Sequence, residues 1–112
     1  MALENDDLMS PPSGVTPLIL NVTIVGRDSG KTDEIVRLLK KIQSKALSDQ
    51  EPGTSVYRIT RGAVDKNVVN VYEVYNDAAA MAFHTENADF KELVSRGEEL
   101  ASELQTKWFS DV

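Results

Sequence analysis

The stretch NVTIVGRDSGKTDEIVRLL, residues 21–39, joins an apolar run to an amphipathic run through a glycine-containing turn. The apolar run starts at residue 18, and side chains two apart in a strand lie on the same face. One face of a strand over 18–25 is then wholly apolar, while the other carries Asn21 and Thr23 among apolar neighbours. After the turn the spacing becomes three and four residues, which predicts a helix over 32–47. The buried stripe of that helix would be Ile35, Leu38, Leu39, Ile42 and Ala46.

The turn itself, GRDSGKT, is similar to a phosphate-binding loop but has the wrong spacing. Such a loop needs four residues between its glycines so that backbone N–H groups close around the phosphates. Gly26 and Gly30 enclose only three residues, and the β-branched Val25 occupies the place of the first glycine. We therefore interpret the stretch as a plain turn, in which Gly30 supplies a flexible backbone and Thr32 or Ser29 caps the following helix.

The rest of the chain predicts two further strands and two further helices. Residues 55–62 and 67–75 are rich in Val, Ile, Tyr and Thr and are joined by a short hairpin connection. Asn76-Asp77 caps the short helix AAAMAFH, and helical spacing resumes from Asp89 to about Lys107. Residues 108–112 form a short last strand or a tail. The order β-α-β-β-α predicts an α+β fold, the ferredoxin-like split βαβ with an antiparallel sheet.

Two further features concern the organisation of the chain. Residues 1–16 are acidic and then rich in Ser, Pro and Gly, so we interpret them as a flexible leader before a domain over 17–112. The first strand is apolar on both faces, whereas the helices of this plan cover only one face of the sheet. A second copy of the chain would cover the other face, sheet against sheet, which predicts a homodimer.

Composition excludes several classes of function. The 112 residues carry a net charge of −6 without a basic cluster, which argues against a nucleic-acid partner. No apolar stretch approaches the ~20 residues of a membrane span, so no membrane partner is expected. The absence of cysteine excludes disulfides and thiolate metal sites. The absence of cysteine and the lack of a secretory signal at the N-terminus together favour a cytoplasmic location.

His84 is the single histidine and the most informative polar residue. In one interpretation it is a helix-end histidine satisfied by backbone or solvent. In the other it is a working group, because imidazole titrates near neutral pH. One histidine without clustered carboxylates or cysteines does not make a metal site, so we expect no metal.

Three segments together resemble the antibiotic biosynthesis monooxygenase (ABM) family, whose members are small dimeric α+β barrels. The first is the opening strand, turn and helix. The second is a Glu-Pro-Gly loop followed by a strand with a Tyr. In the third, a strand ends in Glu-x-Tyr, an Ala-rich helix leads to a His, and a Phe follows. These segments are LNVTIVGRDSGKTDEIVRLLKKI, EPGTSVYRITRG and VYEVYNDAAAMAFHTENADFKELV, and they lie within residues 18–105.

The resemblance implies a monooxygenase that oxidises phenols, quinols or anthrone-like compounds of polyketide origin with O2 and without a cofactor. The substrate anion passes an electron to oxygen, so the protein supplies an apolar pocket, a base and anion stabilisation. In this interpretation His84 is the base or orienting group, Tyr75 holds the substrate, and Asn21 donates to an oxyanion. The aromatic side chains that could form the walls of the pocket, or belong to the core instead, are Tyr57, Tyr72, Phe83, Phe90 and Trp108.

The chain also departs from the family pattern. Asp89 stands where relatives often carry a second His before the Phe, and Tyr75 replaces a Trp. Val94 stands where the haem-degrading branch carries its iron-binding His, so haem degradation is excluded. Because one scaffold hosts many reactions, two alternatives remain open. They are a cyclase, isomerase or decarboxylase with the same pocket, and a non-catalytic dimeric ligand-binding module.

Overall fold

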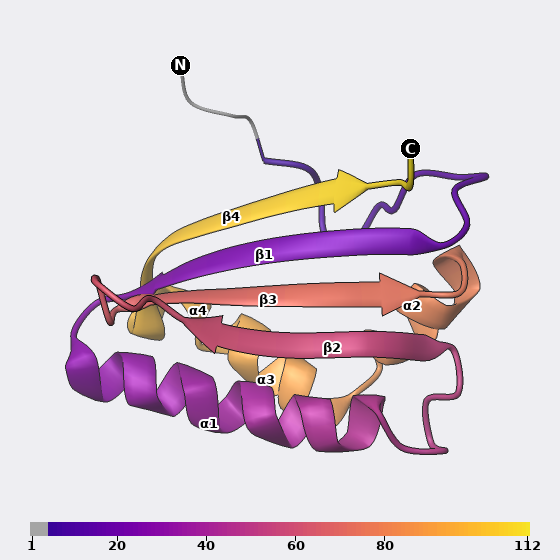
Figure 1. The fold of residues 1–112 in the computed structure, drawn as a ribbon. Coiled ribbons are helices and arrows are strands. Elements are labelled where there is room, and N and C mark those ends of the chain that lie inside the picture. Colours follow the sequence, from indigo (N-terminus) through magenta and orange to yellow (C-terminus); the bar gives the residue numbers. More distant parts are fainter. Residues whose placement is uncertain (1–4) are drawn as a thin grey trace.

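A computed structural model describes residues 5–112 of the chain. Four strands form one antiparallel sheet in the order β2-β3-β1-β4, and the helices lie behind one face of it (Figure 1). This is the α+β, ferredoxin-like architecture that the sequence predicted. The elements in chain order are β1 (Leu18–Gly26), α1 (Ser29–Ala46), β2 (Thr54–Arg61), β3 (Val68–Tyr75), α2 (Ala78–His84), α3 (Ala88–Ser95), α4 (Gly97–Leu100) and β4 (Ala101–Phe109).

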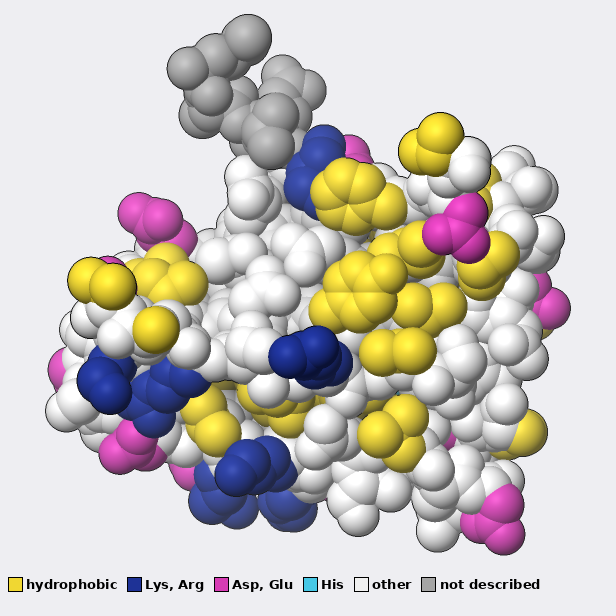
Figure 2. Space-filling model, viewed as in Figure 1, with side chains coloured by type: hydrophobic (Ala, Val, Ile, Leu, Met, Phe, Trp, Pro, Cys, Tyr) yellow, Lys and Arg dark blue, Asp and Glu magenta, His cyan; other side chains and the backbone are white. Residues whose placement is uncertain are grey.

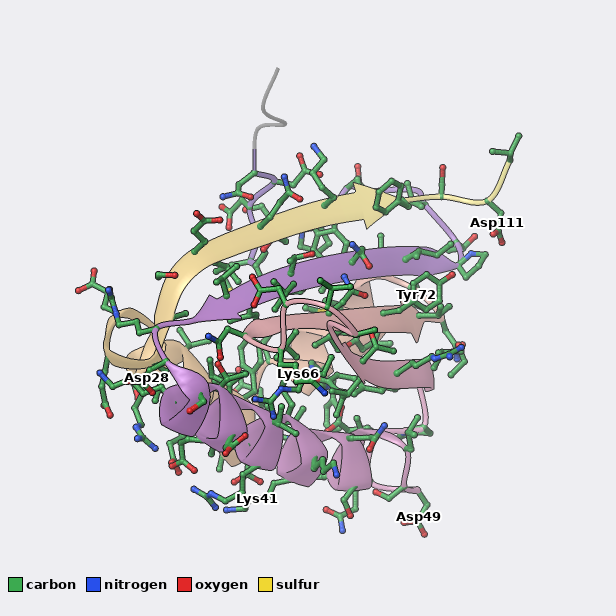
Figure 3. The ribbon with its side chains drawn as sticks, turned by 60° about the vertical axis from the view of Figure 1, so that its left-hand side comes forward. Asp28, Lys41, Asp49, Lys66, Tyr72 and Asp111 are labelled. Carbon is green, nitrogen blue, oxygen red and sulfur yellow. The ribbon has the colours of Figure 1, made fainter. Side chains whose placement is uncertain are left out.

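The core lies between the sheet and α1, as the residue spacing predicted. All five residues of the predicted stripe on α1 are buried, and they pack against the alternate side chains of β1 that begin with Leu18 and Leu20. The helix begins at Ser29 rather than Thr32, so Gly30 belongs to its first turn. Neither predicted residue caps it: the Asp28 side chain accepts a hydrogen bond from the Lys31 N–H at 2.8 Å. Figure 3 labels Asp28, which lies at the start of this helix.

The predicted helix over residues 89–107 is confirmed only as far as Leu100, in two pieces, and is wrong beyond it. The expectation of a short or absent last strand is also wrong. α3 ends at Ser95, α4 is a single turn, and the nine-residue β4 then pairs with β1. Leu104 and Trp108 fit helical spacing because they are four apart, but an even separation also places them on one face of a strand. Pairing with β1 decides in favour of the strand, because β4 supplies hydrogen-bond partners for the backbone N–H and C=O groups along the edge of β1, which a helix would leave unpaired.

The sheet face away from the helices is partly apolar. One row across the strands consists of Phe109, Ile19, Val74 and Val56, and the next consists of Lys107, Asn21, Tyr72 and Arg58. Tyr72 is 40% exposed and Phe109 is 51% exposed. Figure 2 shows hydrophobic side chains gathered over the half of the face where β3 and β4 end. We call these two rows the open face.

The part of the predicted leader that the structure describes follows the outer edge of β4. The Asp6 N–H donates to the Thr106 carbonyl at 2.9 Å, and the Trp108 N–H donates to the Asp6 carboxylate at 2.9 Å. Leu8 then packs against the core. Residues 1–4 of the leader lie outside the described part, and the division at residue 16 stays a prediction. No helix within residues 5–112 is long and apolar enough to cross a membrane.

Candidate functional site

A cavity of about 560 Å³ lies between the sheet and the helices. Most of its walls are apolar side chains from β1, α1, α3 and α4, including Val22, Leu39 and Leu93. His84 and Glu73 contribute polar groups to this wall. An apolar cavity with a few convergent polar groups is the usual form of a small-molecule site.

The chain places His84 through a short capped helix. The Asp77 side chain accepts from the Ala80 N–H at 2.9 Å and starts α2, which ends at His84. The imidazole is only 1% exposed, and its Nδ1 lies 2.6 Å from Oε1 of Glu51 in the loop before β2. The Asn87 side-chain amide donates to Oε2 of the same carboxylate at 3.2 Å. Histidine is therefore held by a buried acceptor rather than by solvent.

A second buried carboxyl group lies on the other side of the imidazole. Glu73 and Tyr75 are two apart on β3, so both side chains point to the helix-covered face. The Tyr75 hydroxyl donates to Oε1 of Glu73, and this oxygen lies 3.9 Å from Nε2 of His84. Burial raises the pKa of Glu73 from 4.5 to about 8, although the Tyr75 hydrogen bond lowers it. Burial and the neighbouring Glu73 both raise the pKa of Tyr75, which stays protonated.

The surroundings of His84 favour its neutral form. The rings of Tyr57, Tyr75 and Phe90 lie around it at centroid distances of 5.6, 5.3 and 5.6 Å. Burial lowers the pKa of His84, and the Glu51 hydrogen bond acts in the opposite direction. When Nδ1 carries the proton and donates to Glu51, Nε2 is left as an acceptor. The site thus presents a neutral imidazole beside a carboxylic acid.

The structure brings together only some of the predicted site residues. His84, Tyr57 and Phe90 line the cavity, and Tyr75 reaches it through Glu73. Asn21 and Tyr72 lie on the open face, as the register of β1 with β3 shows and as Tyr72 illustrates in Figure 3.

The two remaining predicted aromatic residues, Phe83 and Trp108, do not line the cavity. Phe83 is 57% exposed on α2. The Trp108 indole N–H donates to the Asp7 carbonyl at 3.0 Å, beside the leader.

Sequence reasoning missed three residues of the site, Glu51, Glu73 and Asn87. The signal for Glu73 was its position: it is a carboxylate on the same strand face as Val69 and Val71, which are wholly apolar. Glu51 begins the Glu-Pro-Gly loop that the family resemblance rested on. Within residues 5–112 no group of three or more His, Cys, Asp or Glu side chains is arranged to hold a metal ion.

Comparison with known proteins assigns the chain to a family. The sequence profile described as antibiotic biosynthesis monooxygenase matches residues 19–96, most of the chain. The chain belongs to this family. The matched range contains His84, Glu51, Glu73 and Asn87. A search of curated proteins found no match.

Solved structures with the same fold come from several organisms. A Pseudomonas aeruginosa protein has a TM-score of 0.77 and 22% identity, covering 87% of this chain and 95% of its own. A Caulobacter crescentus protein, provisionally named an antibiotic biosynthesis monooxygenase, has a TM-score of 0.72 and 23% identity, covering 88% and 92%. A Mycobacterium tuberculosis protein has a TM-score of 0.76 and 15% identity, covering 87% and 96%. At these identities the likeness shows the fold alone.

Proposed function

We propose that this ABM-family protein is a cofactor-independent monooxygenase that oxidises a phenolic, quinol or anthrone-like small molecule of polyketide origin with O2. The observation that carries the proposal is the single histidine, buried and held by Glu51, in the wall of an apolar cavity. The cavity volume of about 560 Å³ falls within the range of ligand pockets, roughly 300–1,000 Å³. An aromatic substrate of a few fused rings suits such a volume and lining.

The proposed chemistry starts with a proton transfer to the protein. His84 removes a proton from the substrate, and the resulting anion is electron-rich enough to reduce O2 by one electron. Recombination forms a carbon–oxygen bond, and loss of water leaves the product. For an anthrone the balance is that one CH2 group and one O2 give one C=O group and one H2O. The role of the protein is to bind, orient and deprotonate the substrate.

The same base would serve a cyclase, isomerase or decarboxylase, which needs no oxygen. A ligand-binding module without catalysis is less well supported, because it needs a cavity but no buried histidine paired with a carboxylate. Oxygen uptake separates the first two classes, and loss of activity on replacing His84 separates both from the third.

We also infer that two copies associate through the open face. Its support is the apolar row that contains Ile19, Val74 and Phe109, next to Tyr72. Within these rows Val56, Tyr72 and Phe109 are 36%, 40% and 51% exposed, whereas Ile19 is only 7% exposed. Exposed apolar and aromatic side chains that gather on one face mark association sites. Residues of the open face that do not reach the cavity would then act in assembly.

The test is oxygen consumption by purified, chelator-treated protein with an anthrone and with a simple quinol. We expect uptake in the wild type and at least a ~100-fold loss in His84→Ala, the usual contribution of a general base. His84→Asn keeps a polar group near Glu51 and should be equally inactive while folded. Leu47→Ala, at an exposed position after α1, is the control and should keep full activity. Wild-type rates in both His84 variants would overturn the assignment of the base.

A further inference from the structure

Two buried carboxyl groups flank the one imidazole of this chain. Glu51 is 3% exposed and Glu73 is 5% exposed, and they lie on opposite ring nitrogens of His84. Burying two carboxyl groups inside an apolar domain costs several kcal/mol unless they are well partnered. Packing alone does not account for them, because apolar residues of similar size would be at least as stable. Such clusters concentrate at functional sites.

The two carboxyl groups differ in what they can reach. Both oxygens of Glu51 have protein partners, Nδ1 of His84 and the Asn87 amide, and Glu51 does not line the cavity. Glu73 does line the cavity, and its Oε1 accepts from Tyr75. Glu51 can therefore act only through His84, whereas Glu73 can touch a bound molecule.

We propose that Glu73 is a catalytic acid that donates a hydrogen bond to the oxygen of the ligand, and that Glu51 is a positioning residue that keeps Nε2 of His84 free to accept the proton of the ligand. The ligand class is then a planar apolar compound with a carbonyl or phenolic oxygen and an acidic C–H or O–H. This inference rests on the proposed function for the substrate, but its proton transfer does not need oxygen.

The step balances in protons and electrons. For an enolisable carbonyl, the C–H bond breaks, the Nε2–H bond forms, and the electron pair moves to the carbonyl oxygen. The Glu73 O–H donates to that oxygen, and the Glu51 carboxylate stabilises the imidazolium across Nδ1. Because burial raises the pKa of Glu73 to about 8, this group holds its proton at neutral pH.

The other titratable groups around the imidazole fit these roles. The hydroxyls of Tyr57 and Tyr75 lie next to the ring, and burial raises the pKa of both, so they stay neutral. Among the described residues, Arg27 and Glu98 also line the cavity. Tyr75 occupies Oε1 of Glu73, which leaves Oε2 to carry the proton. Neither tyrosine competes with His84 as the base.

The test is deuterium exchange of the methylene protons of anthrone in D2O, followed by NMR without oxygen. We expect the wild type to accelerate the exchange, Glu73→Leu, which removes the hydrogen-bond donor, to lose about 100-fold and Glu51→Gln to lose about 10-fold. Glu86→Gln, an exposed carboxylate paired with Lys91, is the matched control and should stay within about twofold. Exchange without oxygen uptake in air would overturn the oxygenase but leave this inference standing. Absence of exchange in the wild type, or full exchange in both site variants, would overturn the inference.

A second readout reports on the positioning role and does not depend on turnover. His84 is the only histidine, so 15N-histidine labelling gives one ring to observe. We expect a neutral ring protonated at Nδ1 in the wild type and in Glu73→Gln at pH 7. In Glu51→Gln both tautomers should appear, and the pKa of His84 should fall further because the carboxylate that stabilises imidazolium is gone. A wild-type ring protonated at Nε2, or an unchanged titration in Glu51→Gln, would contradict the positioning role.

Discussion

The two faces of the sheet differ in how they treat polar side chains. On the helix-covered face, Glu73, Tyr75 and His84 are almost fully buried, Tyr75 is hydrogen-bonded to Glu73, and His84 is paired with Glu51. On the open face, Asn21, Arg58 and Tyr72 form one row beside an apolar row, and Tyr72 is 40% exposed. Burial of the polar groups on the helix-covered face costs desolvation free energy and is typical of a functional site. The mixed apolar and polar rows of the open face are typical of a surface that contacts another protein.

This difference shows how strongly strand parity decides the role of a residue. Glu73 and Tyr72 are neighbours in sequence, yet one lines the cavity and the other lies on the opposite side of the sheet. A shift of one residue reverses the assignment. The comparison can be tested by variants that act on one face only.

The largest expected effect is on the pH dependence of stability through Glu73. Its pKa is about 8 in the folded protein against 4.5 when exposed, so the folded state binds the extra proton between these values. Stability from this group is complete below pH 4.5 and is lost as the pH rises through 8, by about 1.4 kcal/mol for each pKa unit. Glu73→Gln imitates the protonated acid, so it should match the wild type at pH 5 and be roughly 3–5 kcal/mol more stable at pH 9.

Urea unfolding at pH 5, 7 and 9 measures this difference. Glu103→Gln, an exposed carboxylate on β4, is the control and should show none. His84 acts in the opposite direction because its pKa is lowered, so its contribution is lost as the pH falls below 6.5. A difference between Glu73→Gln and the wild type that does not change with pH would contradict the protonated carboxylic acid.

A smaller effect is expected on assembly through the open face. If a second copy covers this face, Tyr72→Glu places a charge in the interface and should weaken the dimer by about 2 kcal/mol, roughly 30-fold in Kd. Sedimentation velocity over a range of concentrations measures the change. Val64→Glu makes the same kind of replacement at a loop position that is 98% exposed and should leave the dimer intact. A monomeric wild type would refute the dimer directly.

The smallest expected effect compares two valines of one strand. Val69 is 0% exposed on the helix-covered face, and Val74 is partly exposed on the open face. Val69→Ala should cost about 2 kcal/mol of unfolding free energy, and Val74→Ala less than about 1 kcal/mol in the monomer. Denaturation at several protein concentrations checks this. A cost for Val74→Ala that grows with concentration would indicate that association buries this side chain.

Sequence reasoning predicted the fold class, which the structure confirms, and it named three residues that line the cavity, His84, Tyr57 and Phe90. The hydrophobic periodicity of the sequence was clearest where one face of an element is wholly apolar, as in β1 and α1. They failed over 101–109, where Leu104 and Trp108 satisfy both helical and strand spacing and long-range pairing with β1 decides. Asn21 was favoured because it is polar in an apolar strand, but parity places it away from the cavity.

The sequence by itself determined the α+β class, the order of elements as far as β3 and the apolar stripe of α1, and it named His84 as the candidate polar group. These follow from local spacing and composition, which no distant contact alters. Only the tertiary structure decided that Glu51, 33 residues from His84, bonds its Nδ1, and that Glu73 stands at its Nε2. Such neighbours come from a loop, a strand and a helix, and only packing of the helices on the sheet sets their distances.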